Sequence, residues 1–256
     1  MSMPRWAASS FAMFLLVVAS AGVAHAVSDC SAPQKLTRFK VKLPYVNRAV
    51  GSRRSLAIVA IGSSSTAGVG ASDLEHTYPA VLAEELRHRW PQIAVNVINK
   101  GVGGELSSEM LARFERDVLP YHPQLVIWQT GSNQLLLKSG NIDEYIENLR
   151  DGISRLKAAE ADIVLMDPQF APRILARPMH LSVVDAIAAM GNDMNVAVFQ
   201  RFAVMRHWVS SGQYKIEEIV SSDGLHMNDL SYACIARLLA GGLVAASASE
   251  NENRRR

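Results

Sequence analysis

The chain has 256 residues, of which 49% are hydrophobic and 20% are charged. That balance is typical of a globular protein rather than a disordered one, and the length suits one α/β domain with a full core. The formal net charge of +2 is too small to argue for nucleic acid, so we expect no such partner.

Residues 1–26 have the pattern of a signal peptide. Arg5 supplies a positive flank, residues 11–18 form the apolar centre, and Ala24-His25-Ala26 fits the small-x-small cleavage rule. The apolar run is shorter than the roughly 20 residues of a membrane span. We therefore expect an exported protein, periplasmic or secreted, with no stable membrane insertion after cleavage. An uncleaved anchor is the alternative.

The mature chain then holds two cysteines, Cys30 and Cys234. An oxidising compartment would allow one disulfide between the N-terminal segment and the last predicted helix. Two unpaired thiols are the other possibility, because the sequence does not show how far apart the two residues lie.

The next segment, residues 27–54, is polar and is interrupted by Pro33 and Pro44, so we expect an extended arm that carries no chemistry. Leu56 to Ile61 is an unbroken apolar run, which predicts a strand buried on both faces. It gives way at Gly62 to a turn of serines, threonine and glycine. Open α/β sheets place their sites at such strand ends.

The remaining elements alternate. Apolar spacing predicts helices over 77–90, 107–119 (closed by Pro120), 142–158, 181–190 (stopped by Gly191), 202–210 and 229–246. Apolar runs predict strands over 93–98, 124–129, 162–166 and 195–199. Strands that alternate with helices along the chain imply parallel pairing of the strands, so we expect one three-layer α/β/α sandwich over 55–247. A disordered tail is expected over 248–256.

Polar and glycine-rich segments follow the first three predicted strands. Because the carboxyl ends of parallel strands lie at one edge, Ser64, Gly104 and Asn133 should share one crevice. A late loop, which contains Asp223 and His226, should reach the same crevice.

The order and spacing of four motifs resemble those of the SGNH hydrolases, the GDSL-type lipases and esterases, over roughly residues 56–239. The motifs are Gly62-Ser63-Ser64 with Thr66-Ala67-Gly68, Asn99-x-Gly101-x-x-Gly104, Gly131-x-Asn133 and Asp223-x-x-His226. The resemblance implies a flavodoxin-like sheet of five parallel strands between helices, and it implies hydrolysis of esters.

Carried over position by position, the resemblance makes Ser64 the nucleophile, His226 the general base and Asp223 its orienting acid. Ser64, Gly104 and Asn133 would supply the oxyanion hole. Two positions depart from the family pattern. Ser63 stands where the family usually has Asp before the nucleophile, and Gln134 stands where Asp often follows the asparagine.

The residue types support this chemistry independently. A serine hydroxyl is a weak nucleophile that needs a neighbouring base, and imidazole suits that task near neutral pH. A carboxylate three residues before the histidine can hold one ring nitrogen while the other faces the serine. Backbone N–H groups and an amide side chain can stabilise the developing oxyanion. Gln134 and Gln169, near strand ends, are candidates for contacting the substrate.

We therefore predict an exported serine esterase that acts through an acyl-enzyme, with short acyl or O-acetyl groups on a saccharide or small alcohol favoured. A lipase, lysophospholipase or thioesterase of the same family is one alternative, since one fold hosts many substrates. A non-catalytic saccharide- or lipid-binding protein is another. The sequence lacks a phosphate-binding Gly-Lys motif, and Thr66 occupies the last glycine position of the G-x-S-x-G elbow.

No cofactor is expected, and no metal site, since no two histidines have a ligand-like spacing and the cysteines are far apart. The expected partner is a small-molecule or polymeric ester substrate. The oligomeric state stays open.

Overall fold

The computed structural model describes residues 30–136 and 141–253, with side chains described as far as Ser247. The predicted signal peptide lies outside these residues. At the centre is a parallel five-stranded sheet in the order β2-β1-β3-β4-β5. Its strands are β1 (Leu56–Gly62), β2 (Val95–Gly101), β3 (Leu125–Gln129), β4 (Asp162–Met166) and β5 (Ala197–Phe199). This order is flavodoxin-like, as the resemblance to the SGNH hydrolases implies.

The central strands are the most apolar. Every residue of β3 and β4 is buried, and so is every residue of β1 except Ala57. Strands covered by helices on both faces have no reason to alternate polar and apolar residues, which explains the unbroken runs in the sequence. β2 is an edge strand, and it extends three residues past the predicted end because it pairs with β1 up to Gly62 and Gly101.

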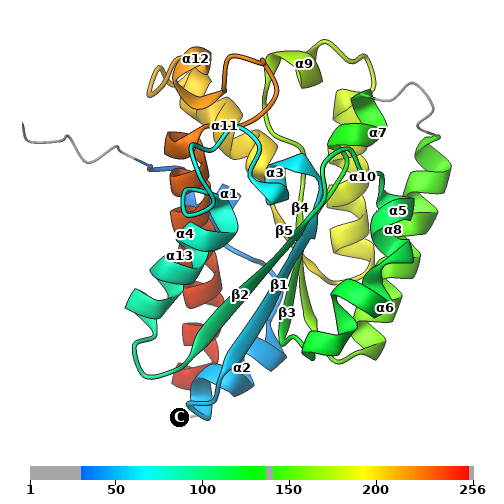
Figure 1. The fold of residues 1–256 in the computed structure, drawn as a ribbon. Coiled ribbons are helices and arrows are strands. Elements are labelled where there is room, and N and C mark those ends of the chain that lie inside the picture. The colour runs from blue at the N-terminus through cyan, green and yellow to red at the C-terminus, as the bar shows by residue number, and fades with distance from the viewer. Residues whose placement is uncertain (1–29, 137–140, 254–256) are drawn as a thin grey trace, which may run out of the picture.

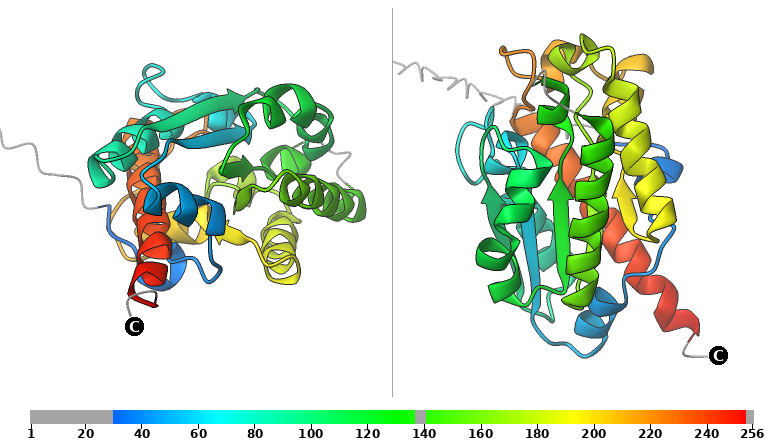
Figure 2. Two further views of the ribbon diagram at one scale, coloured as in Figure 1. Left: turned by 90° about the horizontal axis from the view of Figure 1, so that it is seen from below. Right: turned by 90° about the vertical axis from the view of Figure 1, so that its right-hand side faces the viewer.

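Helices cover both faces of the sheet and make three layers (Figures 1 and 2). α2, α4 and α13 pack together on one face, and α5, α8 and α10 on the other. The longer helices are α2 (Pro44–Gly51), α4 (Tyr78–Arg89), α5 (Ser107–Ala112), α8 (Ile142–Ala158), α10 (His180–Asp193), α11 (Arg201–Ser210) and α13 (Asp229–Asn253). The short ones are α1 (Gln34–Thr37), α3 (Ser64–Ala67), α6 (Phe114–Asp117), η1 (Leu119–Tyr121), α7 (Ser132–Leu136), α9 (Pro172–Leu175) and α12 (Ile216–Ile219).

The N-terminal arm differs from the prediction, because it is partly helical and belongs to the core. Pro44 does not interrupt the chain but begins α2, where its fixed φ and missing N–H suit the first helical turn. Leu43, Val46 and Ala49 are buried in the main core. The disulfide between Cys30 and Cys234 then ties the start of the arm to α13.

Two helices also differ from their predicted extent. The single helix expected over 107–119 is broken at Arg113 into α5 and α6, followed by η1. Gly191 does not stop α10, which continues to Asp193. A Cβ on Gly191 would lie 2.2 Å from the Val198 side chain, so this glycine allows α10 to approach β5 closely.

Helix α13 continues to Asn253, past the predicted end and into the expected tail. Beyond Gly242 this stretch is rich in alanine and contains no proline or further glycine, which favours helix. By length and composition, residues Asp229–Ser247 could cross a membrane, but 56% of that stretch is buried inside the molecule, as in a core helix.

Candidate active site

Ser64 is the first residue of α3, two residues after the end of β1. Of the three consecutive serines, Ser63 and Ser65 are buried at 2% and 1% exposure, while Ser64 is partly exposed. The Ser64 Oγ lies 2.8 Å from His226 Nε2. The structure therefore distinguishes Ser64 from its two neighbours both by access and by its histidine partner.

The serine turn is held from below by Gln129, the last residue of β3, which is fully buried. Its Oε1 accepts hydrogen bonds from the Ser63 N–H at 3.0 Å, the Ser63 hydroxyl at 3.2 Å and the Thr66 hydroxyl at 3.1 Å. Because one buried amide bonds both sides of Ser64, the position of the Ser64 backbone is tightly defined.

The loop before α13 carries Asp223 and His226. The Asp223 carboxylate accepts from the N–H groups of Leu225 at 2.8 Å and His226 at 2.9 Å, and from the Ser221 hydroxyl at 2.8 Å. Its other oxygen is bonded to His226 Nδ1. Burial raises the pKa of Asp223, but these hydrogen bonds, led by the one from the imidazole, outweigh burial and hold the pKa below its ordinary value.

The bonding around His226 assigns its tautomer. An ionised carboxylate can only accept, so Nδ1 must carry the proton that bonds to Asp223. In the neutral ring Nε2 then has a free lone pair, which faces the Ser64 hydroxyl. Serine, imidazole and carboxylate form one continuous line of hydrogen bonds.

The two other predicted donors lie beside the serine turn. A Cβ on Gly103 would be 4.0 Å from Ser64 Cβ, so the loop after β2 passes next to the nucleophile candidate. Gly104 follows at φ 85°, a conformation that favours glycine, and is exposed. Asn133, on α7, donates its Nδ2 to the Glu105 carbonyl at 2.8 Å. Ser64 begins a helix, so its N–H has no acceptor within that helix.

Of the two glutamines expected to contact substrate, one is buried and the other is half-buried beside a small hollow. Gln169 is 1% exposed, which contradicts that expectation. Its Nε2 donates to the Leu225 carbonyl at 3.0 Å, and its Oε1 accepts from Ser132 and Arg201, each at 3.0 Å. Gln169 therefore holds the histidine loop in place. Gln134 is half-buried and donates to the Ser107 hydroxyl at 2.9 Å.

Sequence analysis missed the buried polar residues that support this edge. Arg201 is fully buried and donates through Nε to the Asp167 carbonyl at 2.9 Å. Burial raises the pKa of the Asp167 carboxyl to about 7, although the Phe202 N–H and the Arg201 charge oppose that rise. The available signal was an arginine two residues after the apolar strand β5.

Within the described residues, no group of three or more His, Cys, Asp or Glu side chains is arranged to hold a metal ion. The groups that the structure brings together at the carboxyl end of the sheet are a serine hydroxyl, an imidazole and a carboxylate.

A family model described as the Non-GDSL lipase-like family matches residues 29–249 of the chain. This refines the resemblance noted from the motifs, since Ser63 stands where a GDSL motif would have its aspartate. Among curated relatives, an arylesterase of Vibrio mimicus is 25% identical over 197 residues, covering 77% of this chain and 92% of the relative. An acetylxylan esterase of Geobacillus stearothermophilus is 29% identical over 100 residues, 36% of this chain and 46% of that relative.

Solved structures share the fold. A two-domain esterase active on acetylated mannans superposes with a TM-score of 0.70 at 20% identity, covering 83% of this chain and 56% of that one. An acetylxylan esterase from Geobacillus stearothermophilus superposes with a TM-score of 0.61 at 20% identity, covering 73% of this chain and 94% of that one. The chain thus spans about half the length of the first relatives in each comparison.

Proposed function

Because the chain belongs to the Non-GDSL lipase-like family, we propose that it hydrolyses carboxylic esters through an acyl-enzyme formed on Ser64. The observation that carries the proposal is the line of hydrogen bonds from Asp223 through His226 to the Ser64 hydroxyl. A base that is oriented by a third group and bonded to a hydroxyl is the arrangement that activates a serine.

The proposed reaction has two halves. His226 Nε2 takes the proton as Ser64 Oγ attacks the ester carbonyl, and it returns that proton to the departing alcohol oxygen. In the second half, water loses a proton to Nε2 and attacks the acyl-enzyme. Nε2 then returns that proton to Ser64 Oγ as the bond to the acyl carbon breaks, which releases the carboxylic acid and restores the serine. Asp223 stays ionised throughout, because its hydrogen bonds hold its pKa low, and it stabilises the imidazolium in both halves.

The developing oxyanion would be bound by the N–H groups of Ser64 and Gly104 and by the Asn133 amide. Such donors are effective only when their positions are defined in advance. The Ser64 turn is fixed by Gln129, and the Asn133 amide is fixed by the Glu105 carbonyl. This preorganisation supports the assignment of Ser64 and Asn133 as donors.

We further propose a short acyl group, such as acetyl, on a saccharide or small alcohol. The names of the similar acetylxylan esterase and of the esterase active on acetylated mannans support this class. Two segments bonded to the serine turn expose one valine each, Val69 at 45% and Val102 at 43%. Apolar surface on segments bonded to the serine turn could accommodate a short acyl group.

Export is proposed on two grounds. The pattern of residues 1–26 predicts a signal peptide, and the disulfide between Cys30 and Cys234 suits an oxidising compartment. Mass spectrometry of the protein secreted or released from the periplasm would test this, since cleavage after Ala26 predicts a mature chain that begins at Val27.

The decisive experiment measures kcat/KM for nitrophenyl esters of two, four, eight and sixteen acyl carbons, followed by acetylated xylan and mannan oligosaccharides. We expect the highest value for acetate and a steady fall as the chain lengthens. A rise with chain length would indicate a lipase. No hydrolysis by folded protein would refute the proposal and favour a binding protein.

A further inference from the structure

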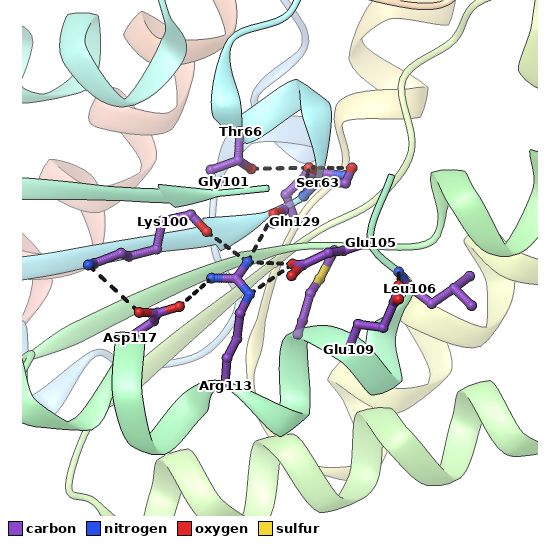
Figure 3. A network of polar contacts seen from close by, with 12 residues as sticks. Ser63, Thr66, Lys100, Gly101, Glu105, Leu106, Glu109, Arg113, Asp117 and Gln129 are labelled. Carbon is purple, nitrogen blue, oxygen red and sulfur yellow. Dashed lines mark hydrogen bonds and ion pairs between the residues drawn. The ribbon is translucent and has the colours of Figure 1, made fainter. Parts of the chain in front are cut away.

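One arginine side chain, that of Arg113, contacts the segment after β2 that carries Gly104 and Glu105 (Figure 3). Arg113 stands at the break between α5 and α6 and is 6% exposed. Its Nη2 donates to the carbonyls of Lys100 at 2.8 Å and Gly62 at 3.3 Å, the ends of β2 and β1. Its Nε and Nη2 both bond the Glu105 carboxylate, at 2.8 Å and 2.6 Å, and its Nη1 bonds Asp117 at 3.2 Å.

The partners of Arg113 lead directly to the three proposed donors. Gly62 is two residues before Ser64, and Glu105 follows Gly104. The backbone carbonyl of Glu105 is the group that accepts from Asn133 Nδ2 at 2.8 Å. A single buried guanidinium therefore touches the two chain segments that carry Ser64 and Gly104, and through Glu105 it reaches Asn133.

Two carboxylates pair with Arg113, one on each side of its guanidinium. Glu105, at 13% side-chain exposure, lies on the active-site side of Arg113, and Asp117, at 15%, lies on the side of α6. A hydrogen bond from Arg116, assisted by Arg113, lowers the pKa of Asp117 to about 2. Buried ion pairs add little net stability because desolvation opposes the Coulomb attraction, so their clearer contribution here is a defined geometry.

We propose that Arg113 and Glu105 are positioning residues that hold the Gly104 N–H and the Asn133 amide at the distance a transition-state oxyanion requires. This inference rests on the proposed function. Oxyanion donors act at about 2.7–3.1 Å, and a displacement of about 1 Å can lower the rate on the order of a hundredfold. Loss of the Glu105 charge would free the loop and leave the Arg113 charge facing Asp117 alone.

The test compares two variants that each remove one carboxylate from Arg113; Asp117→Asn also removes the ion pairs that Asp117 makes with Arg116 and Lys100. Glu105→Gln and Asp117→Asn each replace a carboxylate by an amide of the same shape, one facing the loop and one facing α6. We expect Glu105→Gln to lower kcat by about 10- to 100-fold with KM within about 3-fold, because the donors act in the transition state. Asp117→Asn should lower the melting temperature and leave kcat within about 2-fold.

Two further measurements separate positioning from general damage. The affinity for a trifluoromethyl ketone, which forms an oxyanion on the serine, should fall with kcat/KM in Glu105→Gln and stay unchanged in Asp117→Asn. In an Asn133→Ala background, Glu105→Gln should cost less than in the wild type, since part of its effect acts through that amide.

The outcomes distinguish the two proposals. An active wild type whose Glu105→Gln variant keeps kcat and inhibitor affinity would overturn the positioning role alone. Equal loss of kcat in both variants would also overturn it, because it would indicate a shared structural effect. An inactive, folded wild type, or wild-type activity that survives Ser64→Ala, would overturn the proposed function and this inference with it.

Discussion

The two ends of the sheet differ in how their polar side chains are connected. At the carboxyl end, Ser64, His226 and Asp223 are joined by hydrogen bonds, and Gln129 and Gln169 bond the segments that carry them. At the amino end a hollow of about 510 Å³ opens between α2 and the starts of β1, β3 and β4. It is lined by polar side chains that include Arg48, Arg54, His122 and Glu160.

The amino-end side chains are not organised for chemistry. In the part of the chain that the structure describes, no side-chain hydrogen bond or ion pair joins any two of Arg48, Arg54, His122 and Glu160. A nucleophile, a base and an orienting acid must be coupled to one another. Of these two groups of described side chains, the group at the carboxyl end is coupled in that way, so we place the proposed reaction there rather than in the hollow.

The largest expected effect follows from removing the nucleophile. Ser64→Ala should lower ester turnover by about 10⁴-fold or more while the melting temperature is retained, because within the described part of the chain the hydroxyl bonds His226 alone. Arg54→Ala at the amino end should leave turnover unchanged. A serine-directed phosphonate should label Ser64 in the wild type, and mass spectrometry that finds the label on Ser63 or Ser65 would show that the nucleophile is misassigned.

The second effect concerns pH. The base must be neutral to accept the Ser64 proton, so kcat/KM should rise with pH along one ionisation. Asp223 should add no second ionisation in that range, because its pKa is held below the ordinary value and it stays charged. His226→Ala should abolish the ionisation with nearly all activity, and Asp223→Asn should lose about 10²- to 10⁴-fold.

A matched control for these variants is His122→Ala at the amino end, which should keep both the rate and the pH profile. Residual activity in His226→Ala with an unchanged pH dependence of kcat/KM would contradict the assignment of His226 as the base.

A third effect should act on both ends equally. The disulfide closes a loop with a sequence separation of 204, for which the chain-entropy model gives about 5 kcal/mol of stabilisation. Reduction, or the double replacement of Cys30 and Cys234 by Ser, should lower the melting temperature while kcat of the folded protein stays within about 2-fold. Equal melting temperatures with and without reductant would contradict a stabilising bridge.

The sequence predicts the architecture well, because buried parallel strands must be continuous apolar runs. The bounds of α8 and β4 agree with their predicted ranges. The spacing of motifs also places Ser64, Gly104 and Asn133 at one edge, where the structure has them. Their roles in catalysis remain predictions for the experiments above.

What the sequence does not predict is the set of long-range side-chain bonds beneath the site. Arg113 lies in a segment that predicts an ordinary amphipathic helix, and its bond to Gly62 spans 51 residues. Gln169 was expected to face the substrate, but its partners, Leu225 and Arg201, lie 56 and 32 residues away. Such bonds depend on how elements pack in three dimensions, which local propensity does not encode.

The smallest expected effect is on the pH dependence of folding stability, and it arises from a buried carboxyl group at the carboxyl end of the sheet. Asp167 follows β4 at the carboxyl end and is 2% exposed, and burial raises its pKa to about 7. Between about pH 4 and 7 the folded state therefore holds a proton that the unfolded state has lost. Stability should fall as pH rises through this window, by at most about 4 kcal/mol, and the loss should be complete above pH 7.

Asp167→Asn keeps an acceptor for the Phe202 N–H and should flatten the fall in melting temperature between pH 5 and 8. Glu160→Gln, an exposed carboxyl at the amino end, should leave the slope as in the wild type. If Asp167→Asn and the wild type have the same slope, Asp167 is ionised in the folded protein throughout this range, and the carboxyl end holds a buried charge rather than a buried acid.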